Sequence, residues 1–191
     1  MNDEPILKGR ACGSCTLCCK LMGVPELEKP RGAWCTHCKV GQGCGIYSDR
    51  PDVCRGFYCT YLLSPMLGEH WYPGRCKMVV VVESEYGGER VTIHVDAGRP
   101  NAWREQPFYA DLKRWATAAA RDLRQVVVSI GDRLIVILPN EDVDLGVVGV
   151  DERIVLSEVP ENGRLRLRAL KLRADDPRLA GARQGEINES S

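Results

Sequence analysis

The sequence predicts an α+β protein in two parts, and three patterns support this prediction. All ten cysteines of the 191-residue chain lie between Cys12 and Cys76. The residues that follow contain short β-branched runs typical of strands and one apolar repeat at helical spacing. We therefore expect an irregular cysteine-rich domain over residues 1–76, an antiparallel sheet covered by one main helix over residues 77–173, and a polar, disordered tail over residues 174–191.

The first two strands of the predicted sheet form a hairpin. A β-branched run occupies residues 78–82, and apolar residues alternate with polar ones over residues 91–95. A glycine-containing turn at residues 86–89 would join them. His94 falls on the polar face of the second strand, where we expect it to be solvated.

One helix and four further strands complete this part of the chain. Pro107 suits the first turn of a helix, and apolar residues repeat at helical spacing from Phe108 to Leu123. The glycine-containing turn at residues 131–133 predicts a second hairpin. The four predicted strands cover residues 126–130, 134–138, 153–156 and 164–172, the last two being the weaker.

The charge balance argues against one class of partner. The chain has 26 basic and 26 acidic residues, so no net field attracts it to nucleic acid or to an anionic membrane. Arg164, Arg166 and Arg168 share one strand face and could contact phosphate, although charged edge strands more commonly prevent association between sheets. We therefore expect no membrane partner and treat nucleic acid as a minor alternative.

The N-terminus and the hydropathy of the chain predict a cytoplasmic protein. Residues 1–10 lack the apolar stretch of a secretory signal, and the longest apolar run, Met78–Val82, is far shorter than a membrane helix. Thiols stay reduced in the cytosol, so ten cysteines there indicate metal ligation or redox chemistry. Disulfides are the alternative if a leader precedes this sequence.

The spacing of the cysteines predicts metal binding. Cys12 and Cys15, followed by Cys35 and Cys38, spell C-x2-C-x19-C-x2-C, which is the pattern of a zinc ribbon. A second interpretation also starts from Cys12 and Cys15. Together with Cys18 they form C-x2-C-x2-C, which binds a [4Fe–4S] cluster in bacterial ferredoxins, although the usual x3-C-P continuation is absent.

The adjacent residues Cys18 and Cys19 indicate more than one metal atom. Neighbouring side chains project in different directions, so they suit two centres, or one polynuclear centre, better than a single ion. Nine candidate ligands also exceed the four that one zinc ion needs. Thiolates suit zinc and iron–sulfur centres alike, which leaves the identity of the metal open. The predicted ligands are Cys12, Cys15, Cys18, Cys19, Cys35, Cys38, Cys44, Cys54 and Cys59.

The segment before Cys54 predicts the start of a helix. A polar residue followed by Pro51 is typical of a helix N-terminus. Cys54 would then lie in the first turn, where backbone N–H groups favour a thiolate. Arg50 and Arg55 could offset the negative charge of a sulfur-rich site or hydrogen-bond its ligands.

The order of these motifs resembles the CxxCxxCC cysteine-cluster family of YkgJ-like proteins, which are described as zinc- or iron-chelating domains and sometimes as iron–sulfur proteins. The resemblance covers roughly residues 12–60, about a quarter of the chain, and Cys38 and Cys59 lie outside its motif. It implies metal binding by the motif cysteines. The matching residues are Cys12, Cys15, Cys18, Cys19, Cys35, Cys44 and Cys54, with Tyr47, Arg50, Pro51 and Arg55 as accompanying positions.

The leading hypothesis is an intracellular metal-binding protein that holds zinc or an iron–sulfur centre, with the α+β domain available to a protein partner. The alternatives are an iron–sulfur electron carrier or redox sensor, and a zinc-knuckle adaptor for RNA or protein. An iron–sulfur-dependent modifying enzyme ranks last because no catalytic motif is present. Cys76 stands apart and is expected to be a buried bystander, and His37 is expected to point away from the metal.

Overall fold

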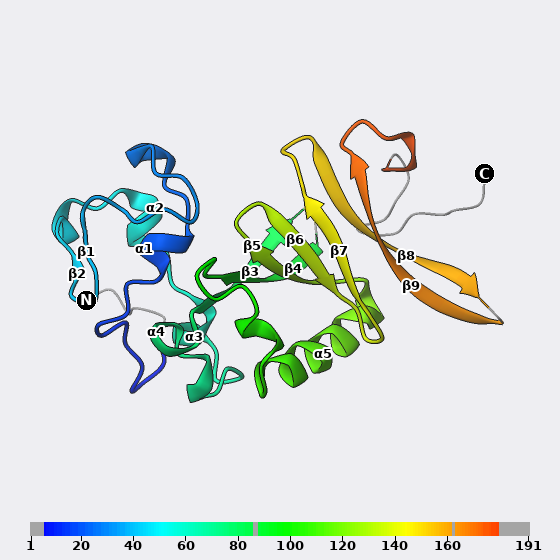
Figure 1. Cartoon of the computed structure of the whole chain (residues 1–191), viewed down its shortest axis with the longest axis horizontal. Helices are drawn as coiled ribbons and strands as arrows, with labels where there is room; N and C mark the ends of the chain where they lie inside the picture. The colour runs from blue at the N-terminus through cyan, green and yellow to red at the C-terminus, as the bar shows by residue number, and fades with distance from the viewer. Residues whose placement is uncertain (1–5, 86–87, 162, 180–191) are drawn as a thin grey trace.

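A computed structural model describes residues 6–85, 88–161 and 163–179 and has the mixed helix-and-sheet composition of the predicted α+β class (Figure 1). The longer elements are β3 (Met78–Glu85), β4 (Gly88–Val95), α5 (Phe108–Ala119), β5 (Gln125–Ile130), β6 (Arg133–Ile137), β7 (Asp142–Val147), β8 (Glu152–Glu161) and β9 (Arg164–Arg173). The short helices and strands are α1 (Cys18–Leu21), β1 (Cys38–Lys39), β2 (Gly43–Cys44), α2 (Asp52–Arg55), α3 (Thr60–Leu63) and α4 (Pro73–Cys76). The 3₁₀-helices are η1 (Pro25–Leu27), η2 (Tyr47–Asp49), η3 (Glu69–Trp71), η4 (Ala102–Arg104), η5 (Ala120–Asp122) and η6 (Pro177–Leu179).

Five strands form the central sheet in the order β3-β4-β5-β6-β7. Neighbouring strands are antiparallel except β4 and β5, which run parallel and pair His94 with Ser129. The prediction of a purely antiparallel sheet is therefore wrong at this pair. The reason is α5, which lies between β4 and β5 in the chain and returns it to the starting end of the sheet, as a βαβ crossover does.

One face of this sheet packs against α5, as the helical period predicts. Trp71 of η3 is buried in the same core, with its ring 5.1 Å from that of Trp115 in the helix. The cysteine-rich part of the chain therefore shares a core with the sheet. The core residues include Met78, Val80, Ile93, Leu112, Ala116, Val126, Val128, Ile135 and Ile137.

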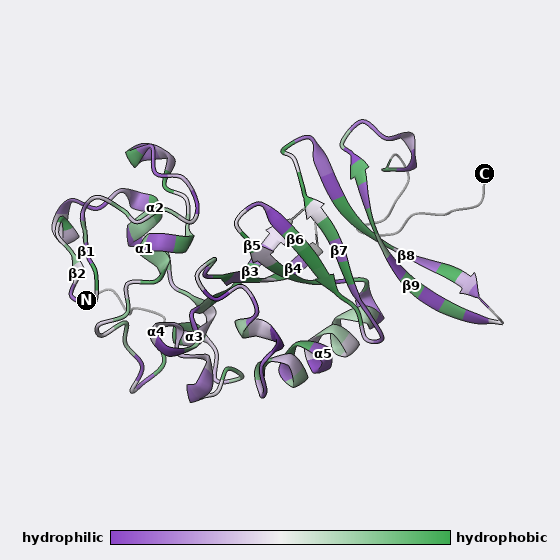
Figure 2. Cartoon of the chain, in the orientation of Figure 1, coloured by the Kyte–Doolittle hydropathy of each residue, from purple (hydrophilic) through white to green (hydrophobic). Residues whose placement is uncertain are grey.

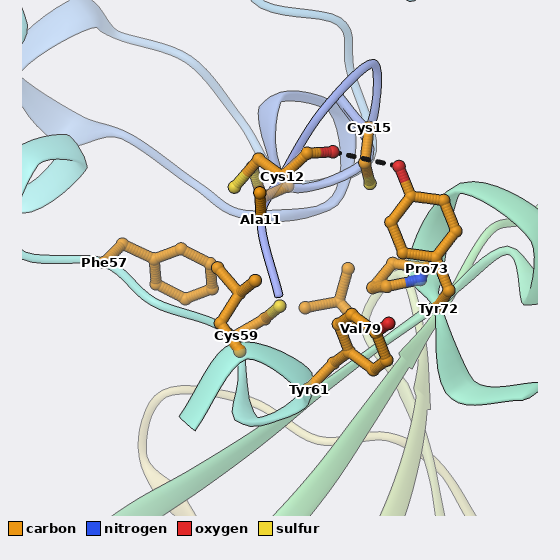
Figure 3. Close-up of a pocket in the computed structure, with 11 residues that line it drawn as sticks. Ala11, Cys12, Cys15, Phe57, Cys59, Tyr61, Tyr72, Pro73 and Val79 are labelled. Carbon is orange, nitrogen blue, oxygen red and sulfur yellow. Dashed lines mark hydrogen bonds between the residues drawn. The ribbon is translucent and has the colours of Figure 1, made fainter. Parts of the chain in front are cut away.

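The opposite face of the sheet is also hydrophobic, and the cysteine-rich segment covers its β3 end. Val79 is 1% exposed because it packs against Leu17 and Leu21. Phe57 and Cys59 lie beside the same cluster (Figure 3). This contact fixes the position of the first cysteines relative to the sheet.

Strands β8 and β9 cover the rest of that face. They form a separate two-stranded sheet, in which hydrophobic and hydrophilic residues alternate (Figure 2). Leu156 and Ala169 pack against Val127 and Val136 of the central sheet. The two weaker predicted strands are therefore present, but they form this second layer rather than extending the main sheet. Strand β7 was not predicted.

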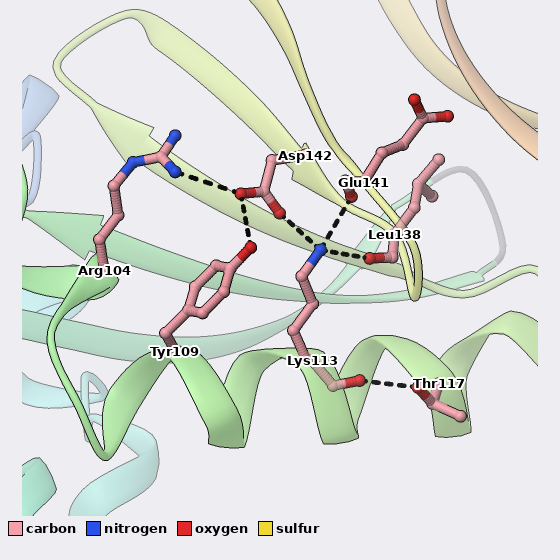
Figure 4. Close-up of polar contacts among 7 residues, drawn as sticks. All are labelled: Arg104, Tyr109, Lys113, Thr117, Leu138, Glu141 and Asp142. Carbon is pink, nitrogen blue, oxygen red and sulfur yellow. Dashed lines mark hydrogen bonds and ion pairs between the residues drawn. The ribbon is translucent and has the colours of Figure 1, made fainter.

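Buried polar contacts fix α5 on both sides. The ammonium of Lys113 donates to Asp142 Oδ1 at 2.7 Å and to two backbone carbonyls that precede β7 (Figure 4). The carboxylate of Asp111 accepts a hydrogen bond from Trp71 Nε1 at 2.8 Å and contacts His70 Nε2 at 2.8 Å. The helix is thus tied to the sheet at one place and to the cysteine-rich part at another.

The C-terminal segment begins in an ordered way. The prediction of a disordered tail from residue 174 is wrong for residues 174–179, because η6 forms there and Leu179 packs against Val155 and Leu172. Residues 180–191 of the predicted tail, and residues 86–87 of the predicted hairpin turn, lie outside the described residues.

The Asp111 contact predicts a pH-dependent contribution to stability. Burial raises the pKa of Asp111, but hydrogen bonds from Trp71 and His70 and the charge of Arg114 outweigh it and hold the pKa below its ordinary value of 3.8. A carboxylate with a lowered pKa in the folded state stabilises the fold above its unfolded-state pKa. That contribution is lost as the pH falls through the folded-state pKa.

We expect Asp111→Asn to lower the free energy of unfolding by about 1–3 kcal/mol at pH 7. The difference from the wild type should shrink below about pH 4, as urea unfolding at several pH values would show. Asp132→Asn, in an exposed turn, is the control and should change stability by less than about 0.5 kcal/mol. An equal Asp111→Asn effect at pH 3 and pH 7 would contradict this account.

Candidate metal centre

Four of the predicted ligands line one recess beside β3. All ten cysteines lie within the described residues. The recess is a small cavity of about 40 Å³ that opens to solvent. Its walls are almost entirely apolar apart from the thiols (Figure 3). The lining residues are Ala11, Cys12, Cys15, Cys18, Phe57, Cys59, Tyr61, Leu62, Tyr72, Pro73 and Val79.

Local backbone structure brings the thiols of the recess together. The N–H of Cys15 donates to the carbonyl of Cys12 at 2.8 Å, which closes a tight turn between them. The hydroxyl of Tyr72 donates to the same carbonyl at 2.9 Å and holds this turn against α4 (Figure 3). Cys18 begins α1, and Cys59 immediately precedes α3. Four short segments thus meet at one place.

Two thiols of the recess, those of Cys15 and Cys59, hold their protons more tightly than an ordinary thiol in the absence of metal. Burial raises the pKa of both Cys15 and Cys59, and the neighbouring thiols of Cys12 and Cys15 raise that of Cys59 further. Metal binding here must therefore release protons, because thiolates and not thiols are the ligands.

The other five predicted ligands form a second thiol group, defined as Cys19, Cys35, Cys38, Cys44 and Cys54. The N–H of Cys35 donates to the carbonyl of Cys19 at 3.0 Å, and that of Cys38 to the carbonyl of Cys35 at 3.0 Å. Cys38 and Cys44 face each other across the β1–β2 pair. Cys54 reaches the group from α2 and interacts with the charges of Cys19, Cys35 and Cys44.

Thiol–thiol interactions dominate the titration of this second group. The hydrogen bond with Cys18 is the main cause that raises the pKa of Cys19 far above its ordinary range, followed by burial. Burial and the neighbouring Cys19 raise the pKa of Cys38 to about 11. Cys18 and Cys19 therefore stand at the border between the recess and the second thiol group, as adjacent residues on two sites would.

A buried lysine that was not predicted lies beside the second thiol group. Lys29 is 8% exposed, and its ammonium donates to the carbonyls of Lys20 and Pro30 at 3.1 Å each and to that of Met22. Burial lowers its pKa, while nearby thiols oppose that effect, the largest contribution coming from Cys35. The thiols that act on this ammonium belong to Cys35, Cys19, Cys18 and Cys54.

The predicted helix start at Cys54 is present, but burial dominates the pKa of its thiol. Cys54 lies in the first turn of α2, where its own N–H already donates to the carbonyl of Pro51 at 2.9 Å. Burial, followed by neighbouring thiols, raises its pKa, and the charge of Arg50 offsets only part of this. Burial and the neighbouring thiols thus determine the direction of the shift at Cys54, and the predicted effect of the helix N-terminus stays a prediction.

The non-cysteine residues of the motif stabilise the loop that precedes Cys54. Arg50 lies 3.7 Å from the ring centroid of Tyr47, and its Nε donates to the Tyr47 carbonyl at 3.0 Å. Arg55 donates to the carbonyls of Arg50 at 2.7 Å and Ser48 at 2.9 Å. The two arginines thus hold the backbone between η2 and α2.

The side chains as they stand do not complete a site for a single ion. Within residues 6–85, 88–161 and 163–179, no three histidine, cysteine or acidic side chains are arranged to hold one metal. The four cysteines of the predicted zinc ribbon are also divided. Cys12 and Cys15 belong to the recess, while Cys35 and Cys38 belong to the second thiol group.

Cys76, His37 and His94 were not predicted to bind metal, and they differ in how deeply they are buried. Cys76 is 5% exposed, with its sulfur near the carbonyls of Trp71 at 3.5 Å and Met78 at 3.4 Å, as expected of a buried non-ligand. His37 is exposed, as predicted. The prediction for His94 is wrong: it is 4% exposed, and burial and the charge of Arg31 lower its pKa to about 4. The face of the sheet that carries His94 was expected to be exposed to solvent, but it is covered where His94 lies.

Comparisons of the chain with protein-family models, curated proteins and solved structures found no match. No helix in the described part of the chain is both long enough and apolar enough to cross a bilayer.

The burial of the thiols predicts their order of chemical modification. Burial raises the pKa of Cys76 to about 11, whereas Cys12 lies on the exposed rim of the recess. Because the thiolate is the nucleophile and Cys76 is also buried, iodoacetamide at pH 8 should modify Cys12 well before Cys76 in chelator-treated protein. Peptide mass spectrometry after timed quenching would measure this. Equal rates at the two residues would contradict the packing described here.

Proposed function

We propose that this chain is an intracellular metal-binding protein that holds zinc or an iron–sulfur centre through two neighbouring groups of cysteine thiolates. The observation that carries this proposal is the buried ammonium of Lys29 beside the second thiol group. The resemblance to the CxxCxxCC family is part of the same proposal and supports it on independent grounds, the order of the motif residues.

The charge of Lys29 matches the charge of a metal–thiolate centre. An ammonium removed from water costs several kcal/mol unless an anion compensates it. Three backbone carbonyls accept hydrogen bonds from Lys29 and offset part of this cost, but they and neutral thiols carry no negative charge. Four thiolates on one zinc ion carry two net negative charges, and so do four thiolates on an oxidised four-iron cluster. A metal held by this group would therefore complete the environment of Lys29.

The same centre would also stabilise the fold. Residues 12–59 have helices of only three or four residues, and their aliphatic contacts with the sheet are made by Leu17 and Leu21. A segment with so small a core needs another source of stability, and metal binding supplies it in small cysteine-rich domains. In this protein, affinity for the metal would be in part the folding energy of residues 12–59.

One observation weighs against the RNA-binding alternative. Arg166, which lies between Arg164 and Arg168 on the same face of β9, pairs with Glu161 at 2.8 Å and with Glu141 at 3.1 Å. These pairs reduce the positive field that phosphate would need. We therefore propose a cytoplasmic protein whose α+β domain serves a protein partner rather than nucleic acid.

Metal removal should loosen the cysteine-rich segment and spare the sheet. The protein would be purified anaerobically, its zinc and iron measured, and hydrogen exchange followed before and after chelation. We expect bound metal and faster exchange over residues 12–59 after chelation, because the sheet has its own core and the segment does not. Exchange that stays the same over these residues, or protein that purifies without metal, would refute the proposal.

Removal of the Lys29 charge should weaken metal binding. In Lys29→Met, a chelator competition assay should show a loss of affinity of about 10- to 100-fold, the usual cost of losing a group that supports metal ligands. Lys39→Met is the matched control, because Lys39 is exposed on β1 next to Cys38. If both variants bound metal as tightly as the wild type, the assigned role of Lys29 would be wrong.

A further inference from the structure

A groove separates the tip of the β8–β9 hairpin from the end of α5. It has a volume of about 780 Å³ and opens to solvent. Its walls come from η5, from the turn between β6 and β7, and from the hairpin on both sides of its tip. The hairpin extends past the central sheet, so that its tip lies at the end of the molecule opposite the cysteine-rich segment (Figure 1).

The apolar residues of the groove continue the core beyond the sheet that covers it. Leu138 and Pro139 line the side of the sheet. On the hairpin, Leu165 and Leu167 share a face of β9 with Ala169, which packs against the central sheet. Leu165 is nevertheless 65% exposed, because the sheet ends before the hairpin does. An apolar surface of this kind is typical of a site that another protein covers.

The charged side chains around these leucines are balanced in sign. Three arginines and three glutamates line the groove. Arg166 already pairs with two of the glutamates. Within the described part of the chain, the remaining three residues, Arg121, Arg164 and Glu158, form no ion pair. The groove therefore presents both positive and negative charge that its own chain leaves unmatched.

We propose that this groove is an interface between two copies of this chain. The inference rests on the proposed role of the α+β domain in binding a protein, and it identifies that protein as a second copy. In a twofold interface the same surface meets itself, so the surface must carry both signs of charge. The formal net charge of zero also means that two copies do not repel each other.

The register of the hairpin indicates which side chains meet. Leu165 lies between Arg164 and Leu167 on β9, and Leu167 is opposite Glu158 on β8. Two hairpins that lie antiparallel with Leu165 at the twofold axis bring Arg164 of each copy to Glu158 of the other. The two Leu165 side chains then contact each other and leave water.

Other occupants match this groove less well. Nucleic acid, or a peptide with charges of one sign, would leave either Glu158 or the arginines unmatched. A small-molecule site encloses its ligand and directs a few polar groups at it. Here the unmatched charged side chains are exposed instead.

Sedimentation of the full chain, purified anaerobically and measured over a wide range of concentration, tests this inference. We expect the wild type to form a species of twice the chain mass. Leu165→Asp should stay monomeric, because it places two carboxylates together at the twofold axis. Val150→Asp is the matched control and should dimerise like the wild type, because Val150 is 98% exposed in the turn between β7 and β8, outside the groove.

An exchange of charges tests the pairing across the interface. Glu158→Arg and Arg164→Glu should each be monomeric, because each places like charges opposite one another. An equimolar mixture of the two variants should form a dimer, in which the introduced arginine meets the introduced glutamate and one original pair is kept. Circular dichroism would verify that every variant folds.

The outcomes separate this inference from the proposed metal binding. A wild type that is monomeric at every concentration would overturn it, even if the variants failed to fold, and would leave the metal-binding proposal standing. Unchanged dimerisation of Leu165→Asp would place the interface elsewhere and overturn it too. A mixture that stays monomeric would overturn the pairing of Glu158 with Arg164. Chelation should leave the dimer intact, whereas its loss together with the metal would assign the interface to the cysteine-rich segment.

Discussion

A sheet that is hydrophobic on both faces is the constraint on which the rest of this structure depends. Helix α5 covers only one face, so the other must be covered by the segments before and after the sheet. The β8–β9 hairpin protects the β5–β6 end, and the cysteine-rich segment protects β3 through Leu17 and Leu21. The sheet thereby fixes the place where the thiols gather.

The cysteine-rich segment in turn depends on electrostatics more than on packing. It buries an ammonium, that of Lys29, among thiols whose pKa values are raised by burial and by one another. The proposed metal would resolve both features at once, because it would convert the thiols to thiolates and give the ammonium a counter-charge. The apolar recess and the charged second thiol group then provide two different environments a short distance apart.

Local sequence patterns identified most of the elements but not how they come together. Alternation and β-branched runs located β3, β4, β5 and β6, yet they carry no information on strand direction, so the parallel β4–β5 pair was missed. Strand β7 was missed although Val143, Leu145 and Val147 alternate with polar residues or glycine, because aspartate and glycine are uncommon in strands. His94 was misplaced because alternation was taken to mean one solvated face, whereas other segments cover both faces.

For the candidate site, too, the sequence predicted local groupings but not their arrangement in space. The motif spacing indicated which cysteines could act together locally, but the partition into recess and second thiol group depends on tertiary structure. Cys59 joins the recess from 40 or so residues away, and nothing in the sequence around Lys29 marks it as buried. The most direct test of the central claim is X-ray absorption at the metal edges of anaerobically purified protein. Our account predicts a first coordination shell of sulfur alone, whereas a shell dominated by nitrogen or oxygen would contradict it.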